Sequence, residues 1–426
     1  MIESDLKKTN NHMNTQLNNE TVLNTTLALC GGKPVLSKEE LKNARLWPIY
    51  GEEEIAGAIE VMQRPADKIY GEMQTFEQEL CAYFGSKYAL STNTGTAALN
   101  TAAFAIGLQK GDEVIVPSYT YWATTLLTQT VGAVPVFVDC ESHTANLDPA
   151  LIEAKITSRT KAISVVHLWG MPADMDGIMS LAKKYNLRVI EDCSHAHGAE
   201  YRGKKIGTIG DIGCFSLQNS KLMPAMEGGF LLTNNRDYHA RSVAFGHYGR
   251  VPEDHEMHRF NATSFGNKYR IHPISCKLGR LALKKLDARN KVICDHVEKI
   301  KNSIRGLKGI TLFEVPSHIS RVYYQFEICY DESLTGVKKG KIIQALVAEG
   351  AWVGNERYPI QHQQNIYKED SLWSAPVKVP DHLPVTESIH SQILELPIFA
   401  FCEEKVVDQY IAAFHKVWSQ LSELKS

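Results

Sequence analysis

Residues 213–234, GCFSLQNSKLMPAMEGGFLLTN, contain one cationic side chain, Lys221, between a short apolar run and a glycine pair. An amine at the mouth of a sheet would be partly desolvated, which lowers its pKa and makes it a neutral nucleophile toward a carbonyl group. A surface lysine is the commoner alternative, so Lys221 indicates chemistry only if suitable partners accompany it.

Thr94, Gly95 and Thr96 stand in STNTGTAALN, at the expected start of a helix. Free backbone N–H groups and the positive end of the helix dipole favour an anion such as phosphate at this place. An ordinary helix cap uses the same residue types, and a short motif alone does not separate the two readings.

Two further groups follow predicted strands. Asp192 ends LRVIED, a strand of buried type, where a carboxylate is costly to desolvate without a cationic or hydrogen-bonding partner. A plain helix cap is the alternative for Asp192. Tyr119, Tyr121 and Trp122 in PSYTYWAT offer flat surfaces for stacking on an aromatic ring, although core packing explains them equally well.

A nucleophilic amine, an anion cradle, a buried carboxylate and a stacking ring together match the needs of pyridoxal phosphate. A lysine holds the aldehyde of this cofactor as a Schiff base, and an acidic partner keeps its pyridine nitrogen protonated so that the ring withdraws electrons. The four groups therefore predict a pyridoxal phosphate site. No metal site is expected, because the nine cysteines show no CxxC spacing.

From about residue 85, apolar runs alternate with amphipathic segments, which predicts a parallel sheet flanked by helices. Strands are expected at 113–117, 134–139, 162–167, 187–192, 213–217 and 229–233. Helices between them are expected at 95–107, 120–132, 148–156 and 173–186. Ligands of such sheets bind beyond the carboxyl ends of the strands, where the four groups stand.

Beyond about residue 275 the pattern changes to a long helix over 277–304, a strand over 322–330, further helices and an amphipathic helix over 403–424. This order is typical of a second, α+β domain. We therefore expect three parts: a disordered Asn- and Thr-rich tail at 1–28, a large domain at 29–275 and a small domain at 276–426.

The composition excludes several classes of partner. With 46 Lys plus Arg against 48 Asp plus Glu, the formal net charge is −2, which gives no electrostatic case for nucleic acid or an anionic membrane. No apolar run approaches the roughly 18 residues of a membrane span, and the N-terminus lacks the apolar centre of a signal peptide. Scattered cysteines fit a reduced compartment. We expect a cytoplasmic protein that binds a small molecule or a second copy of itself.

From WPIYGEEE to the C-terminus, the chain resembles the DegT/DnrJ/EryC1/StrS family of pyridoxal-phosphate-dependent aminotransferases. The motifs that carry the resemblance, in the family's order, are TGTAALNTAA, GDEVIVPSYTYWAT, PVFVDCESHTANLDP, TKAISVVHLWGMPADMD, VIEDCSHAHGAEYRGKKIGTIGDIGCFSLQNSK, EGG, GNKYRIHP and LPIF. The resemblance implies fold type I of these enzymes, the aspartate-aminotransferase-like α/β fold, with a large domain on a mainly parallel sheet and a smaller C-terminal α+β domain.

Carried over by position, the resemblance assigns roles to single residues. It implies that Lys221 forms the Schiff base and later moves the proton between the substrate carbon and the cofactor, while Asp192 pairs with the pyridinium nitrogen. Tyr121 would stack on the ring, and His195 would lie near the phenolic oxygen. The phosphate would be held by Gly95, Thr96, Ala97 and Ser216.

The chain also departs from the family pattern. The family works as a homodimer whose partner chain sends an Asn from a GxNYR loop to the phosphate, whereas this chain reads GNKYR. Either Lys268 from the partner subunit meets the phosphate as a point charge, which we favour, or Asn267 does so from one residue earlier. Met226 replaces a common Gly before EGG and could narrow the entrance over the cofactor or pack on a neighbouring loop. Tyr358 and His362 in YPIQH align with a segment that borders the substrate, with a structural role as the alternative.

The implied reaction is a ping-pong transamination from L-glutamate or L-glutamine to a keto-sugar, such as a sugar nucleotide, or to a keto-cyclitol. The opening ALCGGKPVL resembles members of the cyclitol and aminohydroxybenzoate type.

A pyridoxal-phosphate-dependent sugar dehydratase is one alternative function, but its members carry His in place of the lysine. A non-catalytic cofactor-binding regulator is another, disfavoured by the complete set of groups. An NAD-linked dehydrogenase is not supported, because no GxGxxG follows the first strand.

Overall fold

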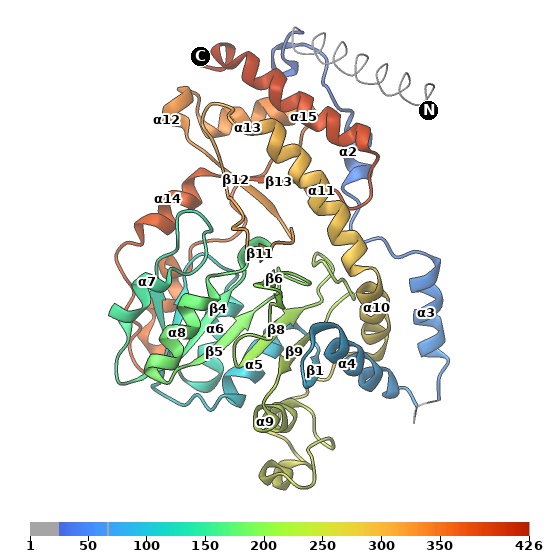
Figure 1. Ribbon diagram of the computed structural model, residues 1–426, viewed down its shortest axis with the longest axis vertical. Helices are drawn as coiled ribbons and strands as arrows, with labels where there is room; N and C mark the ends of the chain where they lie inside the picture. The colour runs from blue at the N-terminus through green and yellow to red at the C-terminus, as the bar shows by residue number, and fades with distance from the viewer. Residues whose placement is uncertain (1–24, 66–67, 426) are drawn as a thin grey trace.

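The computed structural model describes residues 25–65 and 68–425. Figure 1 shows two lobes: a larger one built on a central sheet, and a smaller one around β12, β13, α13 and α15. Of the tail expected at 1–28, all but the last four residues lie outside the described residues. Within those four, Leu27 is buried.

The central sheet has seven strands in the order β1-β9-β8-β5-β4-β2-β3. Five neighbouring strands run parallel: β8 (Ile212–Ser216), β5 (Arg188–Asp192), β4 (Thr160–Val166), β2 (Glu113–Pro117) and β3 (Val134–Val138). Strand β9 (Gly229–Thr233) is antiparallel to β8 and to the edge strand β1 (Tyr88–Thr92). All residues of β2 and β9 are buried, which explains why these strands read as continuous apolar runs. The mainly parallel sheet is confirmed, and β1 is a strand that the sequence analysis missed.

Helices connect these strands and cover the sheet: α5 (Gly95–Ala105), α6 (Ala123–Val131), α7 (Pro149–Ile152), α8 (Met175–Tyr185) and α9 (Arg236–Gly246). Helix α7 is shorter than expected because the chain tightens into a 3-10 turn over Glu153–Lys155. Helix α6 ends at Gly132 and α8 at Asn186, both in the left-handed conformation that Gly and Asn adopt most readily. The four helices expected from the sequence are therefore present.

The helix expected over 277–304 is two helices, α10 (Pro273–Lys284) and α11 (Leu286–Ile304). The Lys285 N–H bonds to the carbonyls of Ala282 and Leu283, a tightened turn that ends the α10 ladder. Among the described residues, three α-helices precede β1: α2 (Lys38–Ala44), α3 (Glu52–Met62) and α4 (Gly71–Phe84). Helix α10 packs against α3 and α4, so it joins the large lobe.

The small lobe contains an antiparallel sheet of β10 (Ile310–Leu312), β12 (Phe326–Tyr330) and β13 (Ile393–Leu396). Its further helices are α12 (Glu332–Thr335), α13 (Lys339–Ala348), α14 (Pro384–Gln392) and α15 (Glu404–Ser419). The N-terminal segment docks here: Ala28 N–H donates to Glu349 Oε1 at 2.7 Å, and the buried Lys416 Nζ donates to Glu349 Oε2 at 2.9 Å. A second small sheet of β11 (Ile319–Ser320), β6 (Glu200–Tyr201) and β7 (Lys204–Lys205) links the two lobes.

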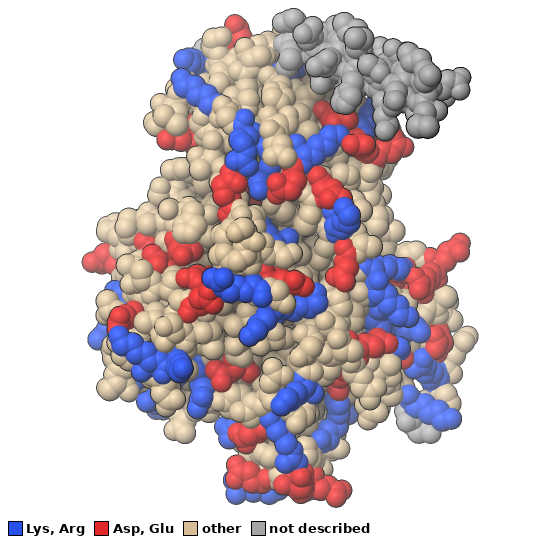
Figure 2. Space-filling model, in the orientation of Figure 1, with Lys and Arg blue, Asp and Glu red and all other residues tan. Residues whose placement is uncertain are grey.

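The surface is mixed in charge on the face that Figure 2 shows, where basic and acidic side chains are interspersed. Among the described residues, no helix is both long and apolar enough to cross a bilayer. The nine cysteines all lie within the described residues and none is paired in a disulfide.

Candidate active site

A cavity of about 470 Å³ lies beyond the carboxyl ends of the parallel strands. Its lining includes nine residues that the sequence analysis selected: Thr94, Gly95, Thr96, Tyr121, Asp192, His195, Ser216, Lys221 and Tyr358. Asp192 and Ser216 are the last residues of β5 and β8. The chain therefore brings the predicted groups together by ending neighbouring strands at one edge of the sheet.

Lys221 stands on a tight turn in the loop between β8 and β9. Its N–H donates to the carbonyl of Gln218 at 2.8 Å, and Asn219 N–H donates to the carbonyl of Met226 at 3.1 Å. The ammonium Nζ lies 4.1 Å from the centroid of the Tyr324 ring. Burial lowers the pKa of Lys221, although the neighbouring Tyr324 acts in the opposite direction. The neutral amine is therefore present at lower pH than in an ordinary lysine.

Asp192 supplies a buried carboxylate, 3% exposed, at the wall of the cavity. Its Oδ2 accepts the Thr124 hydroxyl at 2.7 Å, and its Oδ1 accepts Ser194 N–H at 3.1 Å. Because the Thr124 hydroxyl donates to Asp192, the Thr120 hydroxyl 2.8 Å away donates to Thr124. No cation pairs with Asp192 among the described residues. The arrangement fits a ligand that brings its own positive N–H group.

The anion cradle lies at the start of α5. Thr94 caps this helix by accepting Ala97 N–H at 2.9 Å, so Ala97, which the sequence analysis assigned to phosphate, has its N–H occupied and does not line the cavity. Gly95 and Thr96 line it, and their N–H groups have no partner within the described chain. A Cβ on Gly95 would lie 2.7 Å from the Ser216 Cβ, so only glycine lets the helix approach the end of β8 this closely.

His195 is a neutral donor in this cavity. Its Nδ1 accepts Trp169 N–H at 3.3 Å, which puts the proton of a neutral ring on Nε2, 3.3 Å from the Tyr358 hydroxyl oxygen. The ring stacks on Tyr324 with centroids 4.4 Å apart and an angle of 21°. Burial, followed by nearby cations, holds the pKa of His195 well below its usual value.

Tyr324 and Arg357 also line the cavity, and the sequence analysis missed both. Tyr324 is placed by a left-handed turn, Trp169 (φ 56) and Gly170 (φ 92), that follows β4. The N–H groups of Val322 and Tyr324 donate to the carbonyls of Gly170 and Trp169, each at 3.3 Å. These contacts explain why β12 begins at Phe326 rather than at the expected residue 322.

The environment of Tyr324 joins it to Lys221. Burial raises the pKa of Tyr324, but the adjacent Lys221 and Arg357 outweigh burial and set its pKa below the usual value. The Ser220 hydroxyl lies 3.0 Å from the Tyr324 hydroxyl. Tyr121, by contrast, has a pKa raised by burial, and its ring meets that of Tyr358 edge-on at 6.1 Å. The two tyrosines therefore differ in electrostatics although both border one cavity.

Besides Ala97, three residues that the sequence analysis discussed lie away from the cavity lining. His362 is buried between the Ser118 hydroxyl, 2.7 Å from Nδ1, and Glu387, 3.3 Å from Nε2. Lys268 is exposed in the loop before Arg270 and does not line the cavity of its own chain. Met226 is half exposed, with φ 64 and its N–H donating to the Tyr50 hydroxyl at 2.9 Å. The left-handed φ explains why glycine suits this position.

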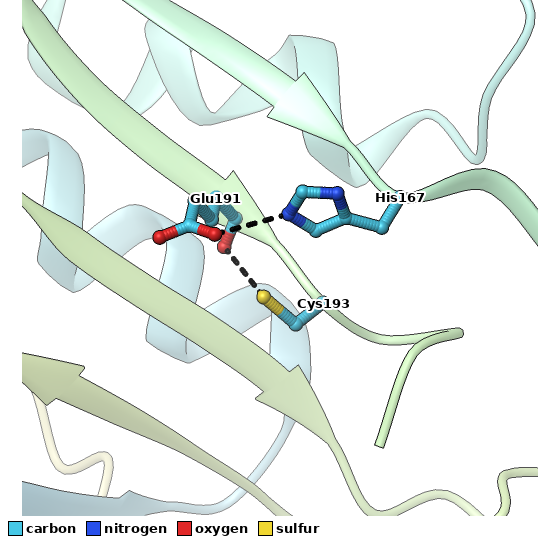
Figure 3. Close-up of side chains that lie close together, drawn as sticks. All are labelled: His167, Glu191 and Cys193. Atoms are coloured by element: carbon cyan, nitrogen blue, oxygen red, sulfur yellow. Dashed lines mark hydrogen bonds and ion pairs between the residues drawn. The ribbon is translucent and has the colours of Figure 1, made fainter. Parts of the chain in front are cut away.

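A second group of side chains, the buried His167, Glu191 and Cys193, lies close together around the end of β5 (Figure 3). The three offer ligand atoms within 4.8 Å of one another. Glu191, however, already accepts hydrogen bonds from His167 and from the N–H groups of Gly207, Ile209 and Gly210. Burial alone would raise the pKa of Glu191, but these bonds outweigh it and lower the pKa. The cluster therefore fixes the end of β5 and is not built as a metal site.

Comparisons with known proteins agree with this geometry. The model of the DegT/DnrJ/EryC1/StrS aminotransferase family matches residues 48–415. The dTDP-3-amino-3,6-dideoxy-alpha-D-galactopyranose transaminase of Aneurinibacillus thermoaerophilus is 34% identical over 81% of this chain and 90% of its own. The L-glutamine:2-deoxy-scyllo-inosose aminotransferase of Streptoalloteichus tenebrarius is 30% identical over 94% of this chain and 99% of its own. The crystal structure of S. venezuelae DesV with a ketimine intermediate has a TM-score of 0.75 at 29% identity, covering 91% of this chain and 98% of DesV. Fold type I is thereby confirmed.

Proposed function

The chain belongs to the DegT/DnrJ/EryC1/StrS family of pyridoxal-phosphate-dependent aminotransferases, and from this premise we propose that it moves the amino group of L-glutamine or L-glutamate to a keto-cyclitol or keto-sugar. The observation that carries the proposal is the convergence of Lys221, Asp192 and the start of α5 on one cavity. Bound there, pyridoxal phosphate would supply an aldehyde that condenses with amines and a ring that withdraws electrons from the substrate carbon.

The residues fit this cofactor because several of their polar groups have no partner of the kind that the cofactor would provide. Asp192 has hydrogen bonds from Thr124 and Ser194 but no cation within the described chain, so it suits a protonated ring nitrogen. The free N–H groups of Gly95 and Thr96 suit a phosphate at the positive end of α5. Lys221 would hold the aldehyde carbon, and the neutral Nε2–H of His195 would donate to an oxygen of the ring.

Lys221 would also move the proton. With its pKa lowered by burial, Nζ would take the proton from the amino-bearing carbon of the donor and deliver it to the cofactor within the same half-reaction. In the second half-reaction it would move a proton the opposite way, from the cofactor to the acceptor carbon. The turn over Gln218–Lys221 fixes the backbone from which the side chain of Lys221 extends. The buried Thr124 hydroxyl donates to Asp192 Oδ2 and is itself oriented by the Thr120 hydroxyl, so the pair holds the carboxylate in place at the cavity wall.

Relatives support the proposed substrates. The L-glutamine:2-deoxy-scyllo-inosose aminotransferase aligns over nearly the whole chain, whereas the dTDP-sugar transaminase aligns over less of it, so a keto-cyclitol is the first acceptor to test. We further propose a cytoplasmic homodimer in which Lys268 from the partner subunit meets the cofactor phosphate. The exposure of Lys268, outside the cavity of its own chain, supports that arrangement.

The visible absorption spectrum tests the function. Purified wild-type protein is mixed with pyridoxal phosphate, beside Lys221→Ala and the control Lys204→Ala, which removes an exposed lysine on β7. We expect a Schiff-base band in wild type and in Lys204→Ala only, and its loss when L-glutamine or L-glutamate is added. Regeneration of the band by 2-deoxy-scyllo-inosose or a keto-sugar nucleotide would identify the acceptor class.

Two results would contradict the proposal. Absence of the band in wild type would exclude the cofactor assignment. A band that depends on Lys221 but that no amino acid discharges would favour a non-catalytic regulator or a dehydratase.

A further inference from the structure

Arg357 lines the cavity with unused hydrogen-bond donors. Its guanidinium makes no hydrogen bond within the described part of the chain, although it forms a long ion pair with Glu395, whose Oε1 is 3.7 Å from Nη1. Arg280 behaves differently, because its guanidinium is bound by the carboxylates of Glu72 and Glu79. A guanidinium presents five N–H groups in a rigid fork, so Arg357 can take a planar oxyanion that Arg280 cannot.

The position of Arg357 separates it from the phosphate cradle. The cradle belongs to the large lobe, at the start of α5, whereas Arg357 precedes Tyr358 in the C-terminal part of the chain. The guanidinium carbon lies 5.6 Å from the centroid of the Tyr324 ring, which stacks on His195. The cavity thus has a cation, Arg357, that comes from the C-terminal part of the chain and is distinct from the reactive Lys221.

We propose that Arg357 binds the α-carboxylate of the amino donor, an inference that rests on the proposed function. L-Glutamine and L-glutamate differ in the side chain but share this carboxylate, and a guanidinium binds a carboxylate through two parallel hydrogen bonds. A diphosphate on the acceptor is the other source of an oxyanion in this reaction. Because donor and acceptor react in separate half-reactions, the two sources can be distinguished.

The test measures the donor half-reaction by loss of the cofactor band in wild type and Arg357→Gln. Two donors are compared: L-glutamate, and L-isoglutamine, in which the α-carboxylate is a carboxamide. Loss of a charged hydrogen-bonded pair is expected to weaken the apparent affinity for L-glutamate about 10- to 100-fold. L-Isoglutamine is expected to bind weakly to both proteins and to change about 2-fold or less. Arg357→Lys should recover part of the L-glutamate affinity, since it keeps the charge but not the fork.

Calorimetric titration with glutarate gives a readout that needs no turnover. Glutarate carries carboxylates but no amine, so its binding to the cofactor-loaded enzyme should weaken in Arg357→Gln. The matched control is Glu395→Gln, which removes the nearest carboxylate but leaves the guanidinium. We expect Glu395→Gln to bind L-glutamate at least as well as wild type, because a competing acidic group is gone.

Four outcomes would overturn the inference. If Arg357→Gln lost affinity for L-glutamate and L-isoglutamine equally, and Glu395→Gln did the same, Arg357 would act only through the fold. If Arg357→Gln bound L-isoglutamine more weakly but L-glutamine as well as wild type, Arg357 would contact the γ-carboxylate instead. A defect confined to a nucleotide-linked acceptor in the second half-reaction would assign Arg357 to its diphosphate. Unchanged L-glutamate affinity and glutarate binding in Arg357→Gln would show that Arg357 binds no carboxylate. If no amino acid discharges wild type, the proposed function itself has failed instead.

Discussion

The two walls of the cavity are built in different ways. The large-lobe wall consists of strand ends and the turns directly after them, including Asp192 at the end of β5 and Lys221 five residues after β8. The small-lobe wall consists of Tyr324, Arg357 and Tyr358, none of which lies in a helix or strand. The two tyrosines take their positions from contacts with the other lobe, Tyr324 with the carbonyl of Trp169 and Tyr358 with the ring of His195.

The walls also differ in how their polar groups are used. Asp192 on the large-lobe wall is held by a hydroxyl and a backbone N–H, with a second hydroxyl behind the first. Arg357 on the small-lobe wall has donors left for a ligand. Together with the proposed function, the comparison leads us to propose a division of labour: the first wall would hold the cofactor in every half-reaction, and the second would distinguish one substrate from another.

Asp192→Asn tests the first wall and should have the largest effect. The variant keeps the size of the side chain but removes the negative charge that, under the proposed function, would face the ring nitrogen. Loss of such an electrostatic group typically slows a reaction about 10²- to 10³-fold. The division of labour requires both half-reactions to slow by similar factors, as single-turnover absorbance would show. A defect in the acceptor half alone would contradict it.

Thr124→Val should have a smaller effect of the same kind. Valine keeps the shape of threonine but removes the hydroxyl that donates to Asp192 Oδ2 at 2.7 Å. One hydrogen bond to a charged group is worth about 1.5–3 kcal/mol, so both half-reactions should slow about 10-fold or more. The control is the buried neighbour Thr125→Val, whose hydroxyl bonds to Tyr367 and the Trp122 carbonyl instead. Equal slowing in both variants would place the effect in packing.

This difference between the walls also explains what the sequence could predict. The apolar runs marked the strands, and the rule that ligands bind at strand ends then selected Asp192 and Lys221. The geometry of Tyr324 depends on two left-handed residues, Trp169 and Gly170, 154 or more residues earlier in the chain, and only the glycine gives a sequence signal for that conformation. Periodicity carries no information on such contacts between lobes.

The resemblance to the family shows the same limit. It led to Tyr358, which lines the cavity, and to His362, which is instead held between Ser118 and Glu387. It said nothing of Arg357, directly before Tyr358. Residues carried over by position follow what relatives share, so a group that gives one chain its own specificity has to be found from the structure.

Tyr324→Phe tests the link between the walls through pH. Burial lowers the pKa of Lys221, while Tyr324 raises it, so removing the hydroxyl should move the pKa further down. The rate of band formation between enzyme and pyridoxal phosphate follows the neutral amine. Its inflection should therefore lie below the ordinary lysine value of about 10.4 in wild type and lower still in Tyr324→Phe. Tyr121→Phe, on the other wall, is the control and should leave the inflection unchanged.

Met226→Gly should have the smallest effect, a small change in stability. It also tests whether the loop on the large-lobe wall leaves the affinity for substrates unchanged. The left-handed region destabilises a folded residue that has a side chain by about 1–2 kcal/mol. Replacement by glycine removes this strain, but the greater freedom of glycine in the unfolded chain cancels about 0.5–1 kcal/mol of the gain. The variant, in which the φ of 64 is no longer strained, should be more stable by about 0.5–1 kcal/mol, measured as a higher urea midpoint at unchanged m value. Met226→Ala shortens the half-exposed side chain but keeps the strain, so it should show no such gain.

Since Met226 does not line the cavity, donor and acceptor affinities should stay the same in both variants. A change in acceptor affinity in both would mean that the loop carrying Lys221 also controls substrate entry, and the division between the two walls would then be wrong.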